Sequence, residues 1–303
     1  MKIMLTGSNG QLGRDIHEVL ENNGYEVIAL THEDCDLVDL FTMKELIMKH
    51  MPQIFINTAA FHNVEACEQD SKKAFKINSE APAFIARMCN YLSIKLIHFS
   101  SDYVFNGKNN SPYSENDTPE PLNIYGLSKL KGENLIKASC CKHLIIRVSG
   151  LYGKYPCRAK NGLNFVQLML KLAKEKGEVK VVTDEIVSPT STASIAKILI
   201  EFLNKDLQGT VHVSSEGSCS WNEFAKEIFD YTDTPVSLLA AVSTDFPSKV
   251  SRPAYSVLDN KYIYSKGYPR MPHWKESLHL YLDELNITSK ENKELEAEAG
   301  LSV

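Results

Sequence analysis

The stretch KIMLTGSNGQLG, residues 2–13, decides the fold, because an apolar strand runs directly into a glycine-rich turn. Gly7, Gly10 and Gly13 have the spacing G-x-x-G-x-x-G, and a helical pattern follows them. Glycine lets the backbone approach a pyrophosphate closely, and the free amides at a helix start attract its negative charge. A plain tight turn also collects glycine for steric reasons. The position on the first strand favours a dinucleotide-binding turn.

Short apolar runs alternate with amphipathic segments through the first half of the chain. We expect strands at 2–6, 26–30, 53–58, 95–100 and 143–149, and helices at 11–22, 41–50, 71–91 and 124–138. Continuous apolar strands separated by helices are typical of a parallel sheet that is covered on both faces. The sequence therefore predicts an α/β fold with a doubly wound, Rossmann-type parallel sheet.

The second half has a less regular pattern. We expect helices at 164–175, 192–203, 221–231 and 274–285, strands at 178–183 and 210–214, and loops at several prolines. This pattern predicts a dinucleotide-binding domain over residues 1–150, to which some later segments return, and a smaller C-terminal substrate-binding lobe over 151–286. Residues 287–303 are charged and lack aromatics, so we expect a disordered tail.

Composition excludes several classes of protein. The 303 residues are 43% hydrophobic and carry a net charge of -5, which argues against broad nucleic-acid binding. The 7 cysteines form no Cys-x-x-Cys pair, so we expect reduced thiols, no disulfide framework and no metal site. No signal peptide and no apolar run of ~18–20 residues is recognisable. We expect a soluble, cytoplasmic protein without a membrane partner.

A second group of residues carries the chemistry. The motif SSDYVF, residues 100–105, follows an expected strand, and Tyr125 and Lys129 form Y-x-x-x-K on an expected helix. A spacing of four places both side chains on one helical face. The same spacing also occurs on helix faces that are simply exposed to solvent. A nearby ammonium lowers the pKa of a phenol from its usual value of about 10. With the glycine turn, this pattern predicts Tyr125 as the acid–base residue, Lys129 as its partner and as a ligand of the nicotinamide ribose, and Ser101 as the holder of a substrate carbonyl.

The residue type at the end of the second strand indicates whether the site prefers NADH or NADPH. An NAD-preferring site usually has an acid there, whereas Glu33 and Asp34 come slightly late in this chain. Arg14 would face a 2′-phosphate, although an exposed helix arginine explains it equally well. The sequence favours NADPH, with NADH as the alternative.

These motifs resemble extended short-chain dehydrogenases, and within them the dTDP-4-dehydrorhamnose reductase family. The resemblance covers about residues 1–285 and rests on GSNGQLG at 7–13, NTAA at 57–60, SSDYVF at 100–105, NIYGLSK at 123–129, SPT at 188–190 and RP at 252–253. The family carries Thr at position 101, where Ser keeps the hydroxyl. The resemblance implies an oxidoreductase of activated-sugar and cell-surface polysaccharide biosynthesis. Its reaction would be the NAD(P)H-dependent reduction of the 4-keto group of a nucleotide-activated 6-deoxyhexose, from dTDP-4-dehydrorhamnose to dTDP-rhamnose or a close analogue.

The resemblance also implies roles for individual residues. Cofactor contacts are implied at Gly7, Gly10, Gln11, Leu12, Gly13, Asp36, Leu37, Ala59, Ala60, Phe61, Tyr125 and Lys129, with the turn at the pyrophosphate, residues 36–37 at the adenine and residues 59–61 along the ribose. Substrate contacts are implied at Ser101, Asp102, Gly150 and Arg252. The Arg252 guanidinium would clamp a diphosphate, with a surface salt bridge as the alternative. The partner is a nucleotide sugar, and a homodimer is left open.

Two departures leave alternatives open. This chain has AAFHNVE at 59–65 against the family's AAHTxVD, and Gly150 replaces a tryptophan, which opens space for a bulkier sugar, another ketone position or relaxed selectivity. A sugar-nucleotide epimerase or dehydratase is one rival, although Tyr103 follows Asp102 where a dehydratase needs glutamate. A non-catalytic NADP-binding subunit similar to the beta subunit of methionine adenosyltransferase is another. His98, Trp221 and Trp274 are expected to be packing residues.

Overall fold

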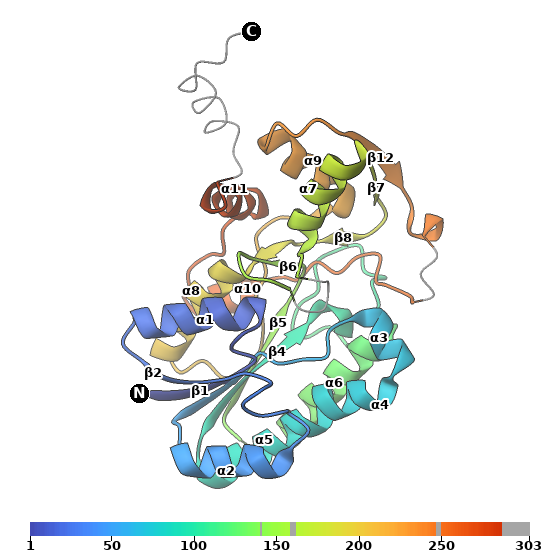
Figure 1. Cartoon of the computed structure of the whole chain (residues 1–303). Coiled ribbons are helices and arrows are strands. Elements are labelled where there is room, and N and C mark those ends of the chain that lie inside the picture. Colours follow the sequence, from blue (N-terminus) through green and yellow to red (C-terminus); the bar gives the residue numbers. More distant parts are fainter. Residues whose placement is uncertain (140, 158–161, 247–249, 287–303) are drawn as a thin grey trace.

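The computed structural model describes residues 1–139, 141–157, 162–246 and 250–286. A parallel sheet at its centre has the strand order β10-β5-β4-β3-β1-β2 (Figure 1). The six strands are β1 (Lys2–Thr6), β2 (Glu26–Leu30), β3 (Ile54–Asn57), β4 (Lys95–Ser101), β5 (His143–Val148) and β10 (Gly209–His212). The order reverses at β1, which pairs with β2 on one side and β3 on the other. The predicted doubly wound fold is therefore confirmed.

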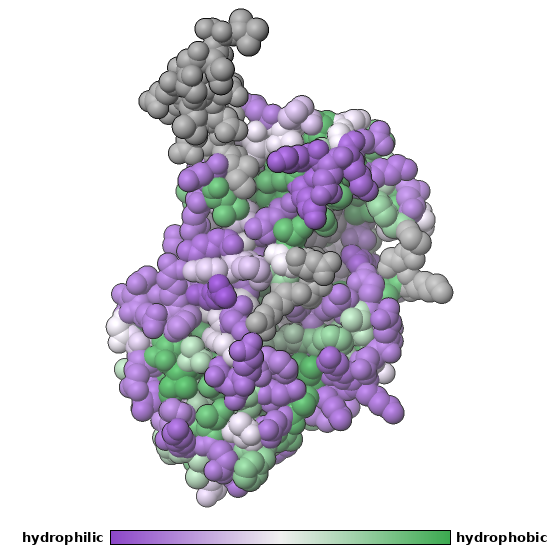
Figure 2. Space-filling model, viewed as in Figure 1, coloured by the Kyte–Doolittle hydropathy of each residue, from purple (hydrophilic) through white to green (hydrophobic). Residues whose placement is uncertain are grey.

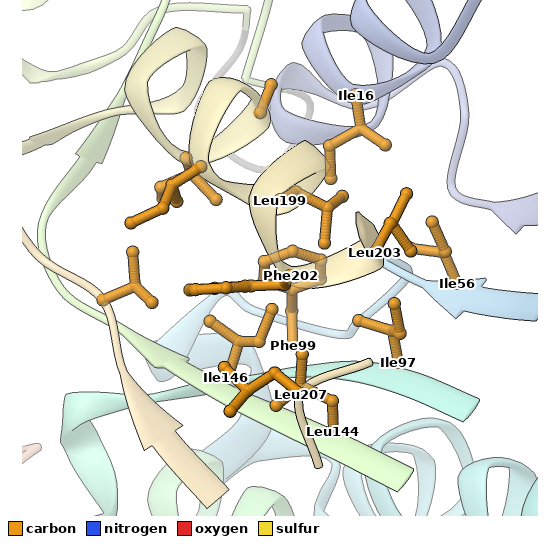
Figure 3. Packing of buried hydrophobic residues seen from close by; sticks show 14 of the residues in the cluster. Ile16, Ile56, Ile97, Phe99, Leu144, Ile146, Leu199, Phe202, Leu203 and Leu207 are labelled. Carbon is orange, nitrogen blue, oxygen red and sulfur yellow. The ribbon is translucent and has the colours of Figure 1, made fainter. Parts of the chain in front are cut away.

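Helices cover both faces of the sheet (Figure 1). One face packs against α1 (Gln11–Asn22) and α8 (Thr192–Asn204), and the other against α2 (Leu40–His50), α5 (Ala81–Leu92) and α6 (Ile124–Ala138). Side chains alternate along a strand, so Ile3 and Leu5 of β1 enter the first core and Met4 enters the second. Figure 3 shows Phe202 of α8 lying over strand residues such as Phe99 and Ile146. Burial on both faces explains the continuous apolar strands.

The helix expected at 71–91 is present and runs without a break over residues 71–92, but it contains a π-helical turn. It consists of α4 (Ser71–Phe75), a π-helical segment η1 (Lys76–Glu80) and α5. Pro82 lies in the first turn of α5 and has no N–H to donate to the carbonyl four residues earlier. The π segment accommodates this missing bond, and its Asn78 side chain donates to Ser128 of α6 at 3.0 Å.

A second core lies above the sheet in Figure 1. It contains α7 (Phe165–Lys176), α9 (Trp221–Tyr231) and α11 (Trp274–Glu284), together with the parallel pair β7 (Glu178–Val182) and β12 (Ser237–Ala241). The sequence analysis missed β12. Although β10 and α8 come after residue 150, they belong to the central sheet and its cover, and the exact domain division stays a prediction. The tail expected at 287–303 lies outside the described residues.

Shorter elements complete the described chain. They are α3 (Val64–Gln69), α10 (Lys261–Ser265), the pairs β6 (Leu151–Tyr152) with β9 (Thr190–Ser191) and β8 (Ile186–Val187) with β11 (Cys219–Ser220), and 3-10 turns η2 (Asp102–Val104) and η4 (Ser243–Asp245). Predicted boundaries elsewhere agree with the structure to within one or two residues.

Three features of the described residues bear on the class of protein: the surface, the potential of the helices to span a membrane, and the cysteines. Hydrophilic residues cover much of the face in Figure 2, with hydrophobic ones in smaller groups between them. Within the described ranges, no helix has the length and apolar character to cross a membrane. No disulfide joins the six cysteines that the structure describes, and no cluster of His, Cys, Asp or Glu in the same part of the chain could hold a metal ion.

Candidate active site

A cavity of about 910 Å³ opens at the carboxyl ends of β1, β4 and β5. Its sheet side includes the glycine turn, residues 99–103 and Gly150. The opposite wall comes from the second half of the chain and includes Phe165, Glu185, Trp221, Arg252 and Ser256. Ligands of doubly wound folds bind outside the carboxyl ends of the strands, next to the reversal of strand order. The cavity therefore lies where the fold predicts a ligand.

The glycine turn fits a dinucleotide because it has no room for side chains. Gly7 has φ +72°, and a Cβ there would lie 2.8 Å from the Ala59 nitrogen. A Cβ on Gly13 would lie 2.1 Å from the Gly7 carbonyl oxygen. Gly10 precedes α1 and supplies no side-chain cap to its first amides. These amides line an open cavity and can bind a negatively charged pyrophosphate.

The cavity brings together most of the residues expected to bind the cofactor. Gly7, Gly10, Gln11, Leu12, Gly13, Asp36, Leu37, Ala59, Ala60, Tyr125 and Lys129 all line it. Phe61 does not, since its backbone pairs with Asn78 and its ring lies 5.0 Å from the Lys73 ammonium. Arg14 is exposed and stacks on Tyr155, which supports the reading of an exposed helix arginine.

Basic side chains that the sequence analysis missed lie at the same cavity. Lys72, Lys73 and Lys76 reach it from α4 and η1. The amphipathic sequence pattern of this segment does not indicate that one of its faces lines a ligand cavity. Only the packing of α4 and η1 beside α6 brings them there.

The catalytic candidates Ser101 and Tyr125 meet at the base of the cavity. Ser101 ends β4, and Tyr125 is the second residue of α6, whose N-cap Asn123 accepts a hydrogen bond from the Gly126 amide at 2.9 Å. Both side chains line the cavity, and Ser101 is close enough to affect the pKa of Tyr125. The Tyr103 ring packs edge-on against Tyr125 with centroids 5.7 Å apart. Together these contacts hold the phenol beside the strand end.

The pKa of Tyr125 differs from the sequence-based expectation. The neighbouring lysine was expected to lower it, but burial raises it, and the Ser101 hydroxyl offsets only part of the shift. The Lys129 amine donates instead to the Phe99 carbonyl at 2.6 Å. The desolvation of a phenolate costs more free energy than the neighbouring groups offset, so Tyr125 is a protonated phenol at neutral pH.

Asp102 is a buried carboxylate at the same point. It is 3% exposed, and it accepts hydrogen bonds from Ser101 at 2.9 Å and from Ser149 at 2.8 Å. Ser256 provides a further hydroxyl. Burial raises the pKa of Asp102, and the three hydroxyls partly counter that shift. Since Asp102 also lines the cavity, its carboxylate is held in place for a polar ligand.

A buried ion pair fixes α6 against the sheet. Glu133 follows Tyr125 and Lys129 on the same helical face and is fully buried. Arg147 of β5 donates to both of its oxygens, at 2.9 and 2.7 Å, and lies 5.1 Å from the Phe105 ring centroid. Burial alone would raise the pKa of Glu133, but Arg147 holds it below its usual value. The sequence analysis missed this pair because its members lie on different elements.

The remaining expected substrate residues also line the cavity. Arg252 forms an ion pair with Glu65, so the salt bridge that was the alternative is present at the cavity wall. Gly150 has φ +55°, and a Cβ there would lie 3.0 Å from Val187 Cγ2. This backbone conformation disfavours any side chain at position 150, including the tryptophan that the family resemblance would predict there.

Two of the three expected packing residues are confirmed, and one needs correction. His98 is fully buried and Trp274 is 4% exposed within the second core. Trp221 also packs against that core, but its half-buried ring lines the cavity beside Phe165, with centroids 4.6 Å apart. The sequence could not show this, because the wall forms from elements far apart in the chain.

Residues 1–287 match the family model described as the RmlD substrate binding domain. The chain belongs to this family. The RmlD match extends through both cores and includes every residue of the cavity.

Proteins of similar sequence align with nearly the whole length of this RmlD-family chain. The spore coat polysaccharide biosynthesis protein SpsK of Bacillus subtilis is 40% identical over 283 residues, which are 93% of this chain and 97% of SpsK. The dTDP-4-dehydrorhamnose reductase of Aggregatibacter actinomycetemcomitans is 33% identical over 290 residues, 91% of this chain and 97% of that protein.

Solved structures agree with this assignment. A dTDP-4-dehydrorhamnose reductase of Clostridium acetobutylicum superimposes with a TM-score of 0.90 at 37% identity, covering 94% of this chain and all of that one. The Bacillus anthracis reductase in complex with NADP has a TM-score of 0.89 at 36% identity, covering 93% and 99%. A UDP-glucose 4-epimerase of Thermus thermophilus, at 18% identity and a TM-score of 0.80 over 93% and 98%, shares the fold alone.

The start of α6 packs closely against the residues that follow β4, so we expect Gly126→Ala to destabilise the protein. The added Cβ would lie 2.0 Å from the Tyr103 carbonyl oxygen, so the start of α6 must shift. We expect a loss of about 1–3 kcal/mol in the free energy of unfolding, measured by urea denaturation. Leu127→Ala, at the next and exposed position, is the control and should change it by about 0.5 kcal/mol or less. Equal effects of the two changes would contradict this packing.

Proposed function

We propose that this RmlD-family protein reduces the 4-keto group of dTDP-4-dehydrorhamnose, or of a close analogue, with NADPH in polysaccharide biosynthesis. The observation that carries the proposal is the placement of Ser101, Asp102 and Tyr125 in one cavity with the glycine turn, where the Ser101 hydroxyl donates to Asp102 at 2.9 Å. The reductases of Aggregatibacter actinomycetemcomitans and Bacillus anthracis, the latter in complex with NADP, support the substrate and the cofactor.

The cofactor would lie along the glycine turn and the residues near β2 and β3. Gly10, Gln11 and Leu12 would hold its pyrophosphate, while Asp36 and Leu37 would lie by the adenine. When bound, NADPH supplies the hydride that adds to C4 of the sugar. Its nicotinamide ribose would lie near Lys129, which reaches the cavity from α6.

Tyr125 would donate its phenolic proton to the oxygen that forms at C4. A phenol that is protonated at neutral pH suits this role as an acid, and burial keeps Tyr125 in that state. Ser101 would orient the phenol and the carbonyl through its hydroxyl. The phenol and hydroxyl come from different elements, and the Tyr103 ring and the Glu133–Arg147 pair hold those elements together.

Two charged residues would bind the rest of the substrate. Asp102 would accept a hydrogen bond from a sugar hydroxyl, because its carboxylate lines the cavity. Arg252 would bind the diphosphate, whose oxygens compete with Glu65 for the guanidinium. Cysteines without disulfides and a nucleotide-sugar substrate favour the cytoplasm. A homodimer stays a prediction.

The reaction can be tested by mixing the purified protein with NADPH and either dTDP-4-dehydrorhamnose or dTDP-4-keto-6-deoxyglucose. We expect NADPH oxidation that is equimolar with sugar reduction, followed by absorbance and by mass spectrometry of the product. Tight NADPH binding without oxidation in the presence of either sugar would overturn the proposal and favour a non-catalytic NADP-binding subunit.

The proposed role of Asp102 predicts the effect of Asp102→Asn, which preserves shape and removes charge. Loss of a hydrogen bond to a charged acceptor is expected to lower kcat/KM about 10- to 100-fold. NADPH affinity, measured by fluorescence, should remain unchanged. Ser277→Ala, in the second core and outside the cavity lining, is the control and should leave both values unchanged. An unaltered kcat/KM in Asp102→Asn would contradict the role.

A further inference from the structure

A thiol and an imidazole meet inside the cavity. Cys157 and His62 both line it, and Cys157 Sγ lies 3.7 Å from His62 Nε2. Cys157 follows β6, whereas His62 lies in the loop between β3 and α3, so only the fold brings the two side chains together. Among the cysteines that the structure describes, Cys157 is the one that is not buried. A small molecule that enters the cavity can therefore reach this sulfur.

The segment that carries Cys157 is tied to the glycine turn. Gln11 of the turn donates through Nε2 to the Tyr155 carbonyl oxygen at 3.0 Å. Cys157 itself exchanges two backbone hydrogen bonds with Gly162, both 3.1 Å long. These bonds hold the segment against the turn, so the position of the thiol is set by the backbone on both sides of it.

The hydrogen bonds of His62 indicate which of its nitrogens can take up a proton. A carbonyl oxygen only accepts, so His62 Nδ1, which lies 3.4 Å from the Ala60 oxygen, is the donor there. In a neutral imidazole the other nitrogen, Nε2, then accepts from the Cys157 thiol. Imidazole is the side chain that most readily exchanges a proton near pH 7. His62 is thus placed to remove the thiol proton and leave a thiolate, the nucleophilic form of cysteine.

Buried cysteines of the same protein have a different environment. Cys35 also lines the cavity, but it is 8% exposed, and burial raises its pKa to about 11. Burial raises the pKa of Cys67 to about 12, and it also raises the pKa of Cys89 and of Cys219. Thiols of this kind are almost wholly protonated at neutral pH and react slowly. Cys35 therefore provides an internal comparison for Cys157 within one cavity.

The contact between Cys157 and His62 joins two parts of the expected NADPH site. The Cys157 segment is bonded to Gln11, which is expected at the pyrophosphate, and His62 is bonded to Ala60, which is expected along the ribose. A group attached to the sulfur would occupy space that bound NADPH needs. The cavity volume of about 910 Å³ is large enough for a small attached group.

We propose that Cys157 is a redox modification site of the cofactor cavity, which forms a mixed disulfide with a low-molecular-weight disulfide, with His62 as the base, and thereby excludes NADPH. The Cys157 sulfur forms a bond to one sulfur of the reagent while the S–S bond of the reagent breaks. Cys157 is oxidised, and the departing half is reduced to a thiol, which receives the proton that His62 removed. Excess thiol reverses the reaction.

The consequence of this modification for sugar reduction rests on the proposed function. The modification itself and the loss of NADPH binding need no sugar substrate. A protein that fails to reduce dTDP-4-dehydrorhamnose can therefore still show both effects, and the two proposals fail separately.

The reaction can be tested on the full-length protein with oxidised glutathione as the probe. Samples are quenched with acid at intervals, digested, and the modified cysteines identified and quantified by mass spectrometry. At pH 7 we expect Cys157 to be modified at least about tenfold faster than Cys35. Cys35→Ser is the matched control and should be modified at Cys157 as fast as the wild type. Modification of Cys157 that is no faster than that of Cys35 would overturn the proposal.

The role of His62 is tested with His62→Gln, which keeps a polar side chain but has no base. At pH 7 the modification of Cys157 should be slower than in the wild type by about tenfold or more. At about pH 9.5, above the ordinary thiol pKa of about 8.5, the thiol ionises without a base, and the two rates should agree within about twofold. Equal rates at pH 7 would contradict the role of His62 as base, as would a rate that is reduced equally at both pH values.

The exclusion of NADPH is measured by fluorescence titration after the same treatment. The modified wild type should bind NADPH at least about tenfold more weakly, and dithiothreitol should restore the affinity. Cys157→Ser, treated in the same way, should keep the affinity that it had before treatment. Unchanged NADPH affinity in protein that is modified at Cys157 would overturn the proposal.

Discussion

Tyr125→Phe is expected to lower kcat for the reduction of dTDP-4-dehydrorhamnose by about 10²–10⁴-fold. Phenylalanine keeps the ring that packs at 5.7 Å against Tyr103 and removes the hydroxyl near Ser101. The oxygen that forms at C4 then has no phenolic proton to accept. Steady-state kinetics would measure the loss, and fluorescence titration should show NADPH affinity within about threefold of wild type, a difference of under 1 kcal/mol.

The matched control for this change is Tyr152→Phe. Tyr152 is fully buried, lies outside the cavity lining, and its hydroxyl has no hydrogen-bond partner among the residues that the structure describes. Removing that hydroxyl should leave turnover unchanged. If Tyr125→Phe also retains full turnover, Tyr125 is not the acid of the reaction.

The second large effect is expected for Arg147→Met, which should reduce the free energy of unfolding by about 3–5 kcal/mol. The change leaves the fully buried Glu133 carboxylate without the guanidinium that donates to both of its oxygens. Urea denaturation at pH 7 would measure the loss. The double change Arg147→Met with Glu133→Leu removes both charges and should recover most of it, because an apolar pair of similar volume is tolerated.

The dependence of this loss on pH follows from the pKa of Glu133. In the wild type that pKa lies below the unfolded value, so the pair contributes stability above pH ~4.5 and loses it as pH falls through the folded pKa. In Arg147→Met, burial is opposed by Lys137, whose Nζ lies 3.5 Å from Glu133 Oε2, and it should raise the pKa of Glu133. Protonation then neutralises the unpaired Glu133 carboxylate. The loss in the free energy of unfolding should therefore be smaller at pH 5 than at pH 7. A loss below about 1 kcal/mol at pH 7 would contradict the structural role of the pair.

The sequence predicts those features that are local in the chain. The glycine turn is decided by a few adjacent residues, since Gly7 needs its positive φ and Gly13 its missing Cβ. Tyr125 and Lys129 are four residues apart on one helix, so their common face follows from helical geometry. For the same reason the boundaries of α1, α6 and α9 agree with the expected ones.

Features that depend on burial or on distant partners could not be predicted in this way. The raised pKa of Tyr125 comes from desolvation, which no spacing of residues reveals. The Glu133–Arg147 pair and the place of Trp221 at the cavity require the packing of several elements. Pro82 was visible in the sequence, but whether it ends a helix or creates a π segment depends on the contacts that hold both sides together.

The hydride transfer to C4 is tested most directly with NADPH that carries deuterium at the transferable position. The protein and dTDP-4-dehydrorhamnose would be incubated with this cofactor, and the product sugar examined by NMR and mass spectrometry. We expect deuterium at C4 of dTDP-rhamnose, in an amount equal to the NADPH oxidised. Sugar recovered without deuterium, while the protein binds NADPH, would contradict the proposed reaction.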